Sequence, residues 1–300
     1  MTLQQLKYAI TVAESGTITE AATRLYISQP SLTNAIHELE KEMNITIFNR
    51  TNRGIVLSKE GEDFLGYARQ VLEQASILED RYKGASGGKK QFCVSTQHYS
   101  FAVNAFVDLI KQFGQDEYDF SLRETQTYEI IEDVAHMKSE IGILFLNDFN
   151  ETVIKKLLKS HELIFHELFV AKPHVFISVD HPLAHNDVIT NEQLEDYPYL
   201  SFEQGEHNSF YFSEEIFSAT ERRKNIRVRD RATLFNLLIG LNGYTVCSGV
   251  IDKELNGSGI IAVPLADEGD MRIGYIRHQR GLSSRLAYTY IDALRKYIEC

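Results

Sequence analysis

The pattern that most constrains the fold of this chain lies in residues 28–43, where a strong helix start precedes a helix with two chemically different sides. Ser28 is a favourable N-cap, and Pro30 is tolerated in the first turn because its missing N–H has no partner there. At about 100° per residue, a helix over residues 29–43 gathers its apolar side chains on one side: Leu32, Ala35, Ile36, Leu39 and Met43. The opposite side carries Pro30, Thr33, Asn34, His37 and Lys41. The sequence therefore predicts a helix that packs by its back and presents a polar front.

Two shorter helices come before this one. Residues 2–14 have apolar side chains at helical spacing, and Ser15-Gly16 ends that pattern. Thr17 and Glu20 form a capping box, which predicts a second helix as far as Leu25 and a tight turn at residues 26–27. Two short helices joined in this way are typical of a helix-turn-helix, whose polar front enters the major groove of DNA. A three-helix domain whose polar side faces only solvent is the alternative.

A basic hairpin follows and favours the DNA-binding interpretation. Residues 46–48 and 55–57 read as two short strands, and the turn between them contains Arg50 and Arg53. A basic hairpin beside a helix-turn-helix is a wing, which reaches phosphates or an adjacent minor groove.

These motifs together resemble the LysR-type bacterial transcriptional regulators. The resemblance rests on a helix run and a hairpin run: Ala21-Ala22, Leu25, Ile27-Ser28-Gln29-Pro30-Ser31-Leu32-Thr33, Ile36 and Leu39-Glu40, then Ile47-Phe48-Asn49-Arg50, Arg53-Gly54, Leu57-Ser58 and Glu60-Gly61. It covers residues 1–88 strongly and the remainder by architecture and by the length of 300 residues. It implies a fold that is α+β overall. A winged helix-turn-helix spans residues 1–58, a linker helix and hinge residues 59–88, and a two-lobed α/β effector domain residues 89–300.

The candidate DNA contacts lie on the polar front and in the wing: Ser28, Gln29, Pro30, Ser31, Thr33, Asn34, His37, Lys41, Arg50 and Arg53. Many members of the family carry arginine at the position of Asn34, and arginine is the commonest reader of guanine, whereas asparagine pairs best with adenine. Lys41 is the single cation on the front, so we expect modest affinity for each half-site and dependence on dimers.

The charge distribution neither requires nor excludes DNA. The whole chain has a net charge of −11, but residues 1–58 hold five basic and five acidic side chains. The acidity lies in residues 89–300, with a net charge of −9. The front of the chain is therefore neutral, and its affinity for phosphates must come from a few placed cations and helix N-termini.

A heptad pattern runs through residues 59–82. Two adjacent columns form a short coiled-coil seam: Phe64, Val71 and Leu78, and Ala68, Ala75 and Tyr82. The resemblance favours an antiparallel helix pair between two chains, and packing against the helix's own domain is the alternative. Residues 84–88 are rich in glycine and read as a hinge. The family further implies a homotetramer on a pseudo-palindromic operator, and contact with RNA polymerase in activators.

Residues 89–300 alternate short apolar runs with helical patterns, which predicts an α/β fold with largely parallel sheets. The expected strands are 91–95, 118–123, 141–146, 174–179, 198–202, 225–229, 244–248, 259–263 and 272–277. The expected helices are 99–113, 127–137, 151–158, 208–220, 231–241 and 283–299. Matched to the family, lobe I comprises about residues 89–164 and 268–300 and lobe II about residues 165–267, with crossings near 163–170 and 265–271, and the last helix returns to lobe I.

Ligands of open α/β sheets bind at the carboxyl ends of strands, beside helix N-termini. This rule selects an effector site from four loops: Ser95, Thr96, Gln97, His98, Tyr99 and Ser100; Thr125 and Gln126; Phe202 and Gln204; Cys247 and Ser248. The donors crowded around His98 favour a small anionic effector, since the ring titrates near neutral pH. The alternative is that these residues are only helix caps and turns.

Other functions have less support. His181 and His185 lie four apart, but Pro182 places them in a loop, so no metal site is expected. No catalytic or nucleotide-binding motif is visible, and neither an enzyme nor a cofactor is expected. Cys93, Cys247 and Cys300 are too scattered for a disulfide framework. Cys247, near the predicted cleft, leaves a redox-sensing regulator as the alternative function, and a solute-binding module without gene control is a second.

The compartment is also predicted from the sequence. No apolar stretch is long enough to cross a membrane. The opening residues MTLQQLKYAI lack the pattern of a secretory signal. We therefore expect a cytoplasmic protein with no membrane partner.

Overall fold

A computed structural model describes residues 1–51, 54–83, 90–113, 117–207, 209–216, 218, 220, 222–251, 257–266, 269–279, 281 and 283–297. The chain divides into two compact units. The first comprises Met1–Gly88 with the short segment His136–Lys138, and the second comprises Lys89–Ala135 and Ser139–Cys300.

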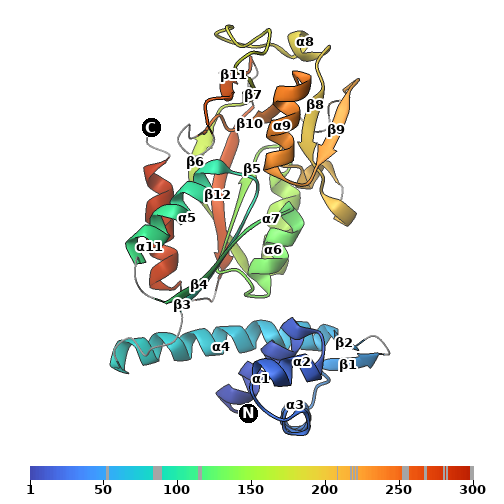
Figure 1. Ribbon diagram of the computed structural model, residues 1–300, viewed down its shortest axis with the longest axis vertical. Helices are drawn as coiled ribbons and strands as arrows, with labels where there is room; N and C mark the ends of the chain where they lie inside the picture. Colours follow the sequence, from blue (N-terminus) through green and yellow to red (C-terminus); the bar gives the residue numbers. More distant parts are fainter. Residues whose placement is uncertain are drawn as a thin grey trace. The chain divides into compact units, whose positions relative to one another are not determined.

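The first unit is a helix-turn-helix with a hairpin and a long helix. Its elements are α1 (Leu3–Ser15), α2 (Ile18–Arg24), α3 (Gln29–Met43), β1 (Phe48–Thr51), β2 (Gly54–Leu57) and α4 (Lys59–Lys83), and β1 and β2 pair antiparallel (Figure 1). The N-cap residues are those expected from the sequence, and of the capping box predicted at Thr17 and Glu20 the structure shows the bond that the Thr17 side chain accepts. Thr17 accepts a hydrogen bond from the N–H of Glu20, and Ser28 accepts one from the N–H of Ser31. The predicted helices and hairpin are confirmed, with the first strand two residues later than expected.

The apolar back of α3 forms the centre of this unit. Leu32 and Leu39 are fully buried, and Ile36 is nearly so. They pack with side chains of α1, α2 and α4 and with Ile47. Met43, at the end of the predicted apolar side, is 39% exposed. The apolar side of α3 is therefore buried as expected, except in the last turn of the helix.

The long helix α4 has two different halves. Near its start, Phe64 packs against the core of the first unit and Ala68 is buried. Farther along, Val71 is 41% and Leu78 is 60% exposed in the single chain. The side chain of Tyr82 lies outside the described part of the structure. The predicted seam therefore packs on its own domain in the first half and is left uncovered in the second.

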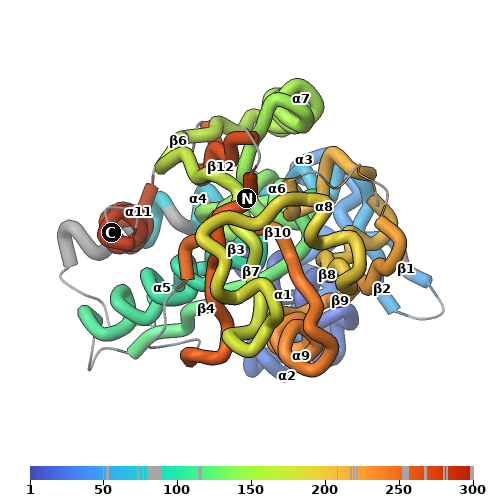
Figure 2. Tube along the Cα trace, turned by 90° about the horizontal axis from the view of Figure 1, so that it is seen from above, coloured from blue at the N-terminus to red at the C-terminus, as the bar shows by residue number. Residues whose placement is uncertain are grey.

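The second unit begins with a five-stranded sheet in the order β4-β3-β5-β12-β6. The strands are β3 (Lys90–Thr96), β4 (Tyr118–Glu124), β5 (Ile141–Leu146), β6 (Leu163–Ala171) and β12 (Met271–His278). Helices α5 (Ser100–Phe113) and α11 (Arg285–Lys296) cover one face together, and α6 (Thr127–Ala135) covers the other (Figure 1). Helix α7 (Glu151–Ser160) lies beside β6 (Figure 2). The last helix thus returns to the first lobe, as expected.

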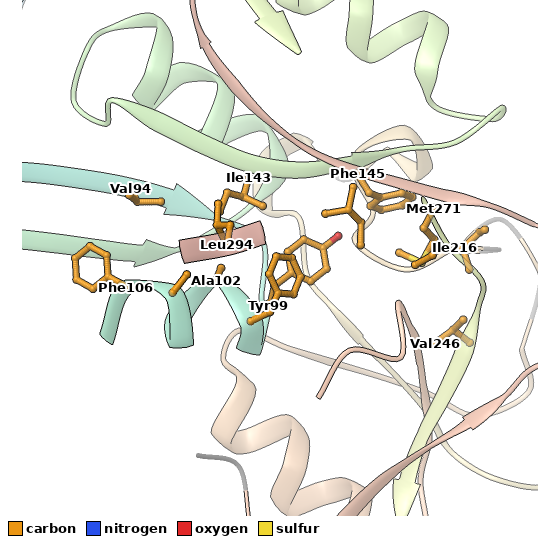
Figure 3. Close-up of a cluster of buried hydrophobic side chains, with 14 of the residues drawn as sticks. Val94, Tyr99, Ala102, Phe106, Ile143, Phe145, Ile216, Val246, Met271 and Leu294 are labelled. Carbon is orange, nitrogen blue, oxygen red and sulfur yellow. The ribbon is translucent and has the colours of Figure 1, made fainter. Parts of the chain in front are cut away.

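The second lobe is smaller and carries two short sheets. Strands β10 (Thr245–Cys247), β7 (His174–Ser178) and β11 (Ile260–Pro264) form one, and β8 (Tyr199–Phe202) and β9 (Asn225–Val228) the other. Helices α8 (Asn191–Leu194) and α9 (Arg231–Leu241) complete the lobe. A single apolar cluster joins the two lobes, and Figure 3 shows Phe145 and Met271 close to Ile216, with Val246 farther into the second lobe. The two lobes therefore share a core.

Two sequence-based predictions for this unit are wrong. The sheets are not largely parallel. The five-stranded sheet is mixed, because β12 runs antiparallel to both β5 and β6, and the three-stranded sheet is antiparallel, because β7 runs antiparallel to β10 and β11. The expected helix 208–220 is also absent from the described residues of that segment. These described residues form irregular chain with one 3₁₀ turn, Phe210–Phe212. Side-chain contacts to the first lobe, described below, replace helical hydrogen bonds there.

Candidate functional site

The polar front of α3 is open in the first unit. Asn34, His37 and Lys41 are exposed, and Thr33 is half-buried. Gln29, Pro30, Ser28 and Ser31 are exposed at the helix start, where the two serine hydroxyls lie 2.7 Å apart and cap the helix. Gln29 accepts a hydrogen bond from Thr19 at 3.3 Å. The front thus offers an amide, an imidazole and an ammonium group to a partner.

A hollow of about 300 Å³ lies between α3 and the hairpin. Thr33, Asn34 and His37 line it on the helix side, and Ile55 lines it on the hairpin side. The hairpin is fixed against α3 by Glu40, whose Oε1 accepts the N–H groups of Ile47 at 2.8 Å and Phe48 at 3.0 Å. Sequence reasoning did not assign this role to Glu40. The side chain of Arg50 and the whole of Arg53 lie outside the described part of the structure.

A pocket between the two lobes of the second unit brings together residues from both. Its lining includes His98, Tyr99 and Ser100 from the start of α5, Phe202 from β8, and Cys247 and Ser248 from the end of β10. Glu214, Glu215 and Arg231 add charged groups. The cavity volume is about 40 Å³, which is room for about three water molecules. As it stands, the pocket admits only a very small group.

His98 is the best-anchored residue of this pocket. Its backbone N–H donates to Glu214 Oε2 at 2.9 Å, and its Nδ1 donates to the same oxygen at 2.8 Å. The ring stacks on Phe202 with centroids 3.8 Å apart and planes 4° apart. Burial alone lowers the pKa of His98, because it disfavours the charged ring. The nearby Glu214 carboxylate has the opposite effect, and the net result is a pKa above the usual range of histidine. His98 therefore presents its backbone N–H and its Nδ1 to a single carboxylate oxygen.

The two neighbouring carboxyl groups differ in their partners. Glu214 Oε1 accepts a hydrogen bond from Gln204 at 3.1 Å, and Gln204 in turn accepts the N–H of Thr127. Glu215 accepts the N–H of Phe202 at 2.8 Å and the hydroxyl of Ser213 at 2.9 Å. Burial, and then the charge of Glu214, raise the pKa of Glu215 to about 8. Glu215 is therefore mostly neutral at pH 7.

Arg231 supplies the pocket's second positive group. It begins α9 and pairs with Glu124 at 2.9 Å. Burial raises the pKa of Glu124 above its usual range in spite of this pair. With His98 paired to Glu214 and Glu215 neutral, the charges that face the pocket nearly cancel.

The structure places about half of the predicted effector residues elsewhere. Six line the pocket: His98, Tyr99, Ser100, Phe202, Cys247 and Ser248. The others are held in internal hydrogen bonds or contacts: Ser95 to Asp133, Thr96 to the carbonyl of Gln97, Gln97 to Tyr99, Thr127 and Phe145, Thr125 to Glu129, Gln126 beneath Gly205, and Gln204 to Glu214. Both faces of β3 are covered, so its polar side chains are used inside the fold.

Three charged lining residues were missed by sequence reasoning. Arg231 follows β9 and opens α9, so the strand-end rule applied to residues 225–231 could have found it. Glu214 and Glu215 lie in the segment that was expected to be helical. No local signal distinguishes them from ordinary surface glutamates.

Cys93 and Cys247, the thiols within the described residues, have environments that disfavour the thiolate. Cys247 Sγ lies 3.6 Å from the carbonyl of His174, and burial raises the thiol pKa of Cys247 far above its usual range. Cys93 lies 3.1 Å from the hydroxyl of Ser139, and burial raises its thiol pKa as well. Since the thiolate is the reactive form, both groups are poorly prepared for oxidation.

His181 makes hydrogen bonds that hold the loop after β7. Its Nε2 lies 3.1 Å from the carbonyl of Asn242, and its Nδ1 accepts the N–H of Leu183. His185 is exposed. The described residues contain no group of three or more potential metal ligands, and no described helix is long and apolar enough to span a bilayer.

Comparison with known proteins gives the class of this chain and then its family. The model of bacterial regulatory helix-turn-helix proteins of the lysR family matches residues 3–62, and the LysR substrate binding domain matches residues 93–299. A winged helix-turn-helix followed by a two-lobed binding domain is the organisation of a ligand-responsive regulator. The chain belongs to the LysR family of transcriptional regulators.

Named relatives agree with this family. The uncharacterized HTH-type transcriptional regulator YnfL of Escherichia coli K12 is 32% identical over 208 residues, 67% of this chain and 65% of the relative. The Hca operon transcriptional activator HcaR of the same organism is 30% identical, over 67% of this chain and 65% of its own. The chain thus spans just under two thirds of these relatives. The RuBisCO operon transcriptional regulator of Allochromatium vinosum is 26% identical, over 94% of this chain and 91% of its own.

Solved structures share the fold. Full-length OxyR from Pseudomonas aeruginosa, in a variant with one cysteine replaced by aspartate, has a TM-score of 0.69 at 21% identity, covering 98% of this chain and 95% of that one. CbnR, a LysR family transcriptional regulator, has a TM-score of 0.59 at 18% identity, covering 99% of both chains. At these identities the likeness extends to the fold alone.

Proposed function

We propose that this chain regulates transcription from a pseudo-palindromic operator in response to a small anionic effector bound between the lobes of the second unit. The observation that carries the effector part is the buried ring of His98, which lies just before the N-terminus of α5 and pairs with a carboxylate through Nδ1. Arg231, which pairs with Glu124, also lines the pocket, and a neutral Glu215 does not repel an anion. Effector binding favours one arrangement of the oligomer and so respaces the DNA-binding domains.

The effector part is tested by thermal unfolding of the full chain with organic acids, amino acids, nucleotides and sugars. A ligand at about 100 times its dissociation constant adds roughly 2.7 kcal/mol of stability. We expect an anion to give the shift, and His98→Ala or Ser100→Ala to abolish it. A shift that persists unchanged in both variants would place the ligand elsewhere.

The DNA part rests on the exposed front of α3. We propose that Asn34 reads adenine, with Thr33, His37 and Lys41 as neighbouring contacts and the wing arginines Arg50 and Arg53 on phosphates. Selection from a random double-stranded DNA pool identifies the operator. We expect Asn34→Ala to lose the selected preference and Arg53→Ala to weaken all sequences. A protein that selects no sequence would instead be a solute-binding module without gene control.

Salt dependence checks the number of phosphate contacts. With so few cations on the recognition face, we expect fewer than about eight ions released per dimer. A steeper slope on the selected operator would contradict this assignment.

The oligomer is proposed on the uncovered half of α4. Val71 and Leu78 expose an apolar stripe that a second copy can cover, and the family implies a tetramer built from such dimers. We further propose a cytoplasmic location, contact with RNA polymerase if the protein activates transcription, and no catalytic activity or cofactor. The redox alternative has little support, because burial keeps Cys247 in the thiol form.

A further inference from the structure

We infer that Glu214 is an internal occupant of the effector's anion position, and that an effector carboxylate binds by displacing Glu214 from His98. This inference rests on the proposed effector site. It adds the chemical class of the group that enters the pocket, a carboxylate, and the contact that this group breaks.

The anion position is defined by two donors that meet at one point. The backbone N–H of His98 and its Nδ1 both reach Glu214 Oε2, at 2.9 and 2.8 Å. They lie just before α5, a helix of 14 residues, whose free N–H groups and dipole favour negative charge. The side chains of His98 and Glu214 are only 5% and 4% exposed. This is therefore a built and enclosed anion site, not a surface ion pair.

A buried histidine ring needs such a partner when it carries a positive charge. An unpaired charge in the interior is costly, and a paired one is tolerated when its hydrogen bonds are made. Glu214 fulfils this need from within the chain when no ligand is present. An entering carboxylate offers the same oxygen to the same two donors, so one charge-assisted pair replaces another. A cationic ligand would instead leave His98 unpaired beside Arg231.

The segment that carries Glu214 is able to leave. Its described residues between 203 and 216 belong to neither an α-helix nor a strand. Its other ties to the first lobe include two ring stacks, Tyr128 on His207 at 3.6 Å and Phe149 on Tyr211 at 4.8 Å. Displacing the Glu214 side chain therefore breaks no helix or strand as long as Glu215 keeps its hydrogen bond to Phe202 in β8 and Ile216 stays in the core between the lobes.

The size of the cavity agrees with displacement. About 40 Å³ accepts a carboxylate group and little more. The remainder of a larger effector needs the space that the Glu214 side chain vacates. Effector binding then removes an interlobe hydrogen bond, which gives the two states of the second unit different contacts.

The test compares the full chain with its Glu214→Gln variant, using acetate as the probe. Glutamine has nearly the shape of glutamate but lacks its charge, so it competes poorly for the imidazolium. We expect acetate to bind Glu214→Gln about tenfold more tightly or better, measured by thermal unfolding at constant ionic strength with chloride as baseline. Acetamide, of similar shape and uncharged, should not distinguish the two proteins. Glu206→Gln, an exposed glutamate of the same segment, is the matched control and should behave as wild type.

A second measurement needs no variant. Hydrogen exchange of the wild-type chain with saturating acetate should increase in residues 209–216 while the start of α5 remains protected. Equal acetate affinity in wild type and Glu214→Gln, or acetate protection of residues 209–216, would overturn the inference. Absence of acetate binding in both proteins would overturn it as well. The regulator proposal is judged separately, by DNA selection.

Discussion

Replacing Glu215 with glutamine should change the pH dependence of stability in a direction that the structure fixes. Glu215 is 3% exposed. It accepts the N–H of Phe202 and the hydroxyl of Ser213. Glutamine keeps the carbonyl acceptor for Phe202, and its NH₂ group is able to donate to the hydroxyl oxygen of Ser213. The substitution therefore removes the ionisable group with little change in shape.

The sign follows from the two pKa values. The carboxyl titrates near 4.5 when unfolded and near 8 when folded. Between these values the unfolded chain releases a proton that the folded chain keeps, so the unfolding free energy falls as pH rises, by about 1.4 kcal/mol per unit. From about pH 5 to pH 7 the loss is about 2.5 kcal/mol. The contribution is fully present below 4.5 and fully lost above 8.

The assay is urea unfolding of the full chain from pH 5 to pH 8. We expect Glu215→Gln to gain stability relative to wild type as pH rises, and the exposed control Glu195→Gln to show no such trend. Exchange of the β8 amide protons localises the effect, because Phe202 donates its N–H to this carboxyl. If the difference between wild type and Glu215→Gln stays constant over this range, Glu215 is ionised in the folded state and the reasoning is wrong.

Other expectations concern packing, assembly and reactivity. Gly61→Ala places a Cβ 2.2 Å from the carbonyl oxygen of Ile47, so thermal unfolding should show a destabilised first unit and DNA binding should be lost. Gly240→Ala, with nothing within 4 Å of the new Cβ, should stabilise α9 by about 0.5–1 kcal/mol; a loss would contradict the open space. Leu78→Lys should shift sedimentation toward monomer without unfolding the chain, and an unchanged oligomer would place the interface elsewhere. Cys247 should react with iodoacetamide at pH 7 only after unfolding, and rapid labelling of the native protein would restore the redox alternative.

The first unit could be predicted closely because its signals are local. The hydroxyls of Thr17 and Ser28 cap helices that begin at the next residue, and such caps act within one turn. The alternation of apolar and polar sides in residues 29–43 requires no knowledge of distant contacts. The exception, Met43, lies in the last turn, where a helix has left the core that set the pattern.

The segment 208–220 shows where local reasoning fails. Phe212 and Ile216 are four residues apart, as on one side of a helix, but the burial of apolar side chains in this segment is set by different neighbours. Ile216 belongs to the core between the lobes, whereas Phe210 is 58% exposed. Glu215 binds the N–H of Phe202 instead of turning to solvent. Contacts between residues far apart in sequence outweigh the weak helical preference of the segment.

Half of the predicted effector residues line the pocket. The other half could not be recognised from the sequence, because contacts between distant residues decide where their side chains point. The rule that ligands bind at strand ends depends only on the course of the backbone. It correctly predicted that His98 and Phe202 lie in the same pocket. It says nothing about which neighbouring side chain faces the cleft. Ser95 on β3 and Gln97 just after it point to internal partners, while the next residue, His98, reaches the pocket. The carboxylate that completes the site, Glu214, comes from 116 residues away. It is positioned by burial opposite a charged ring, and such pairing is decided only when both lobes have folded.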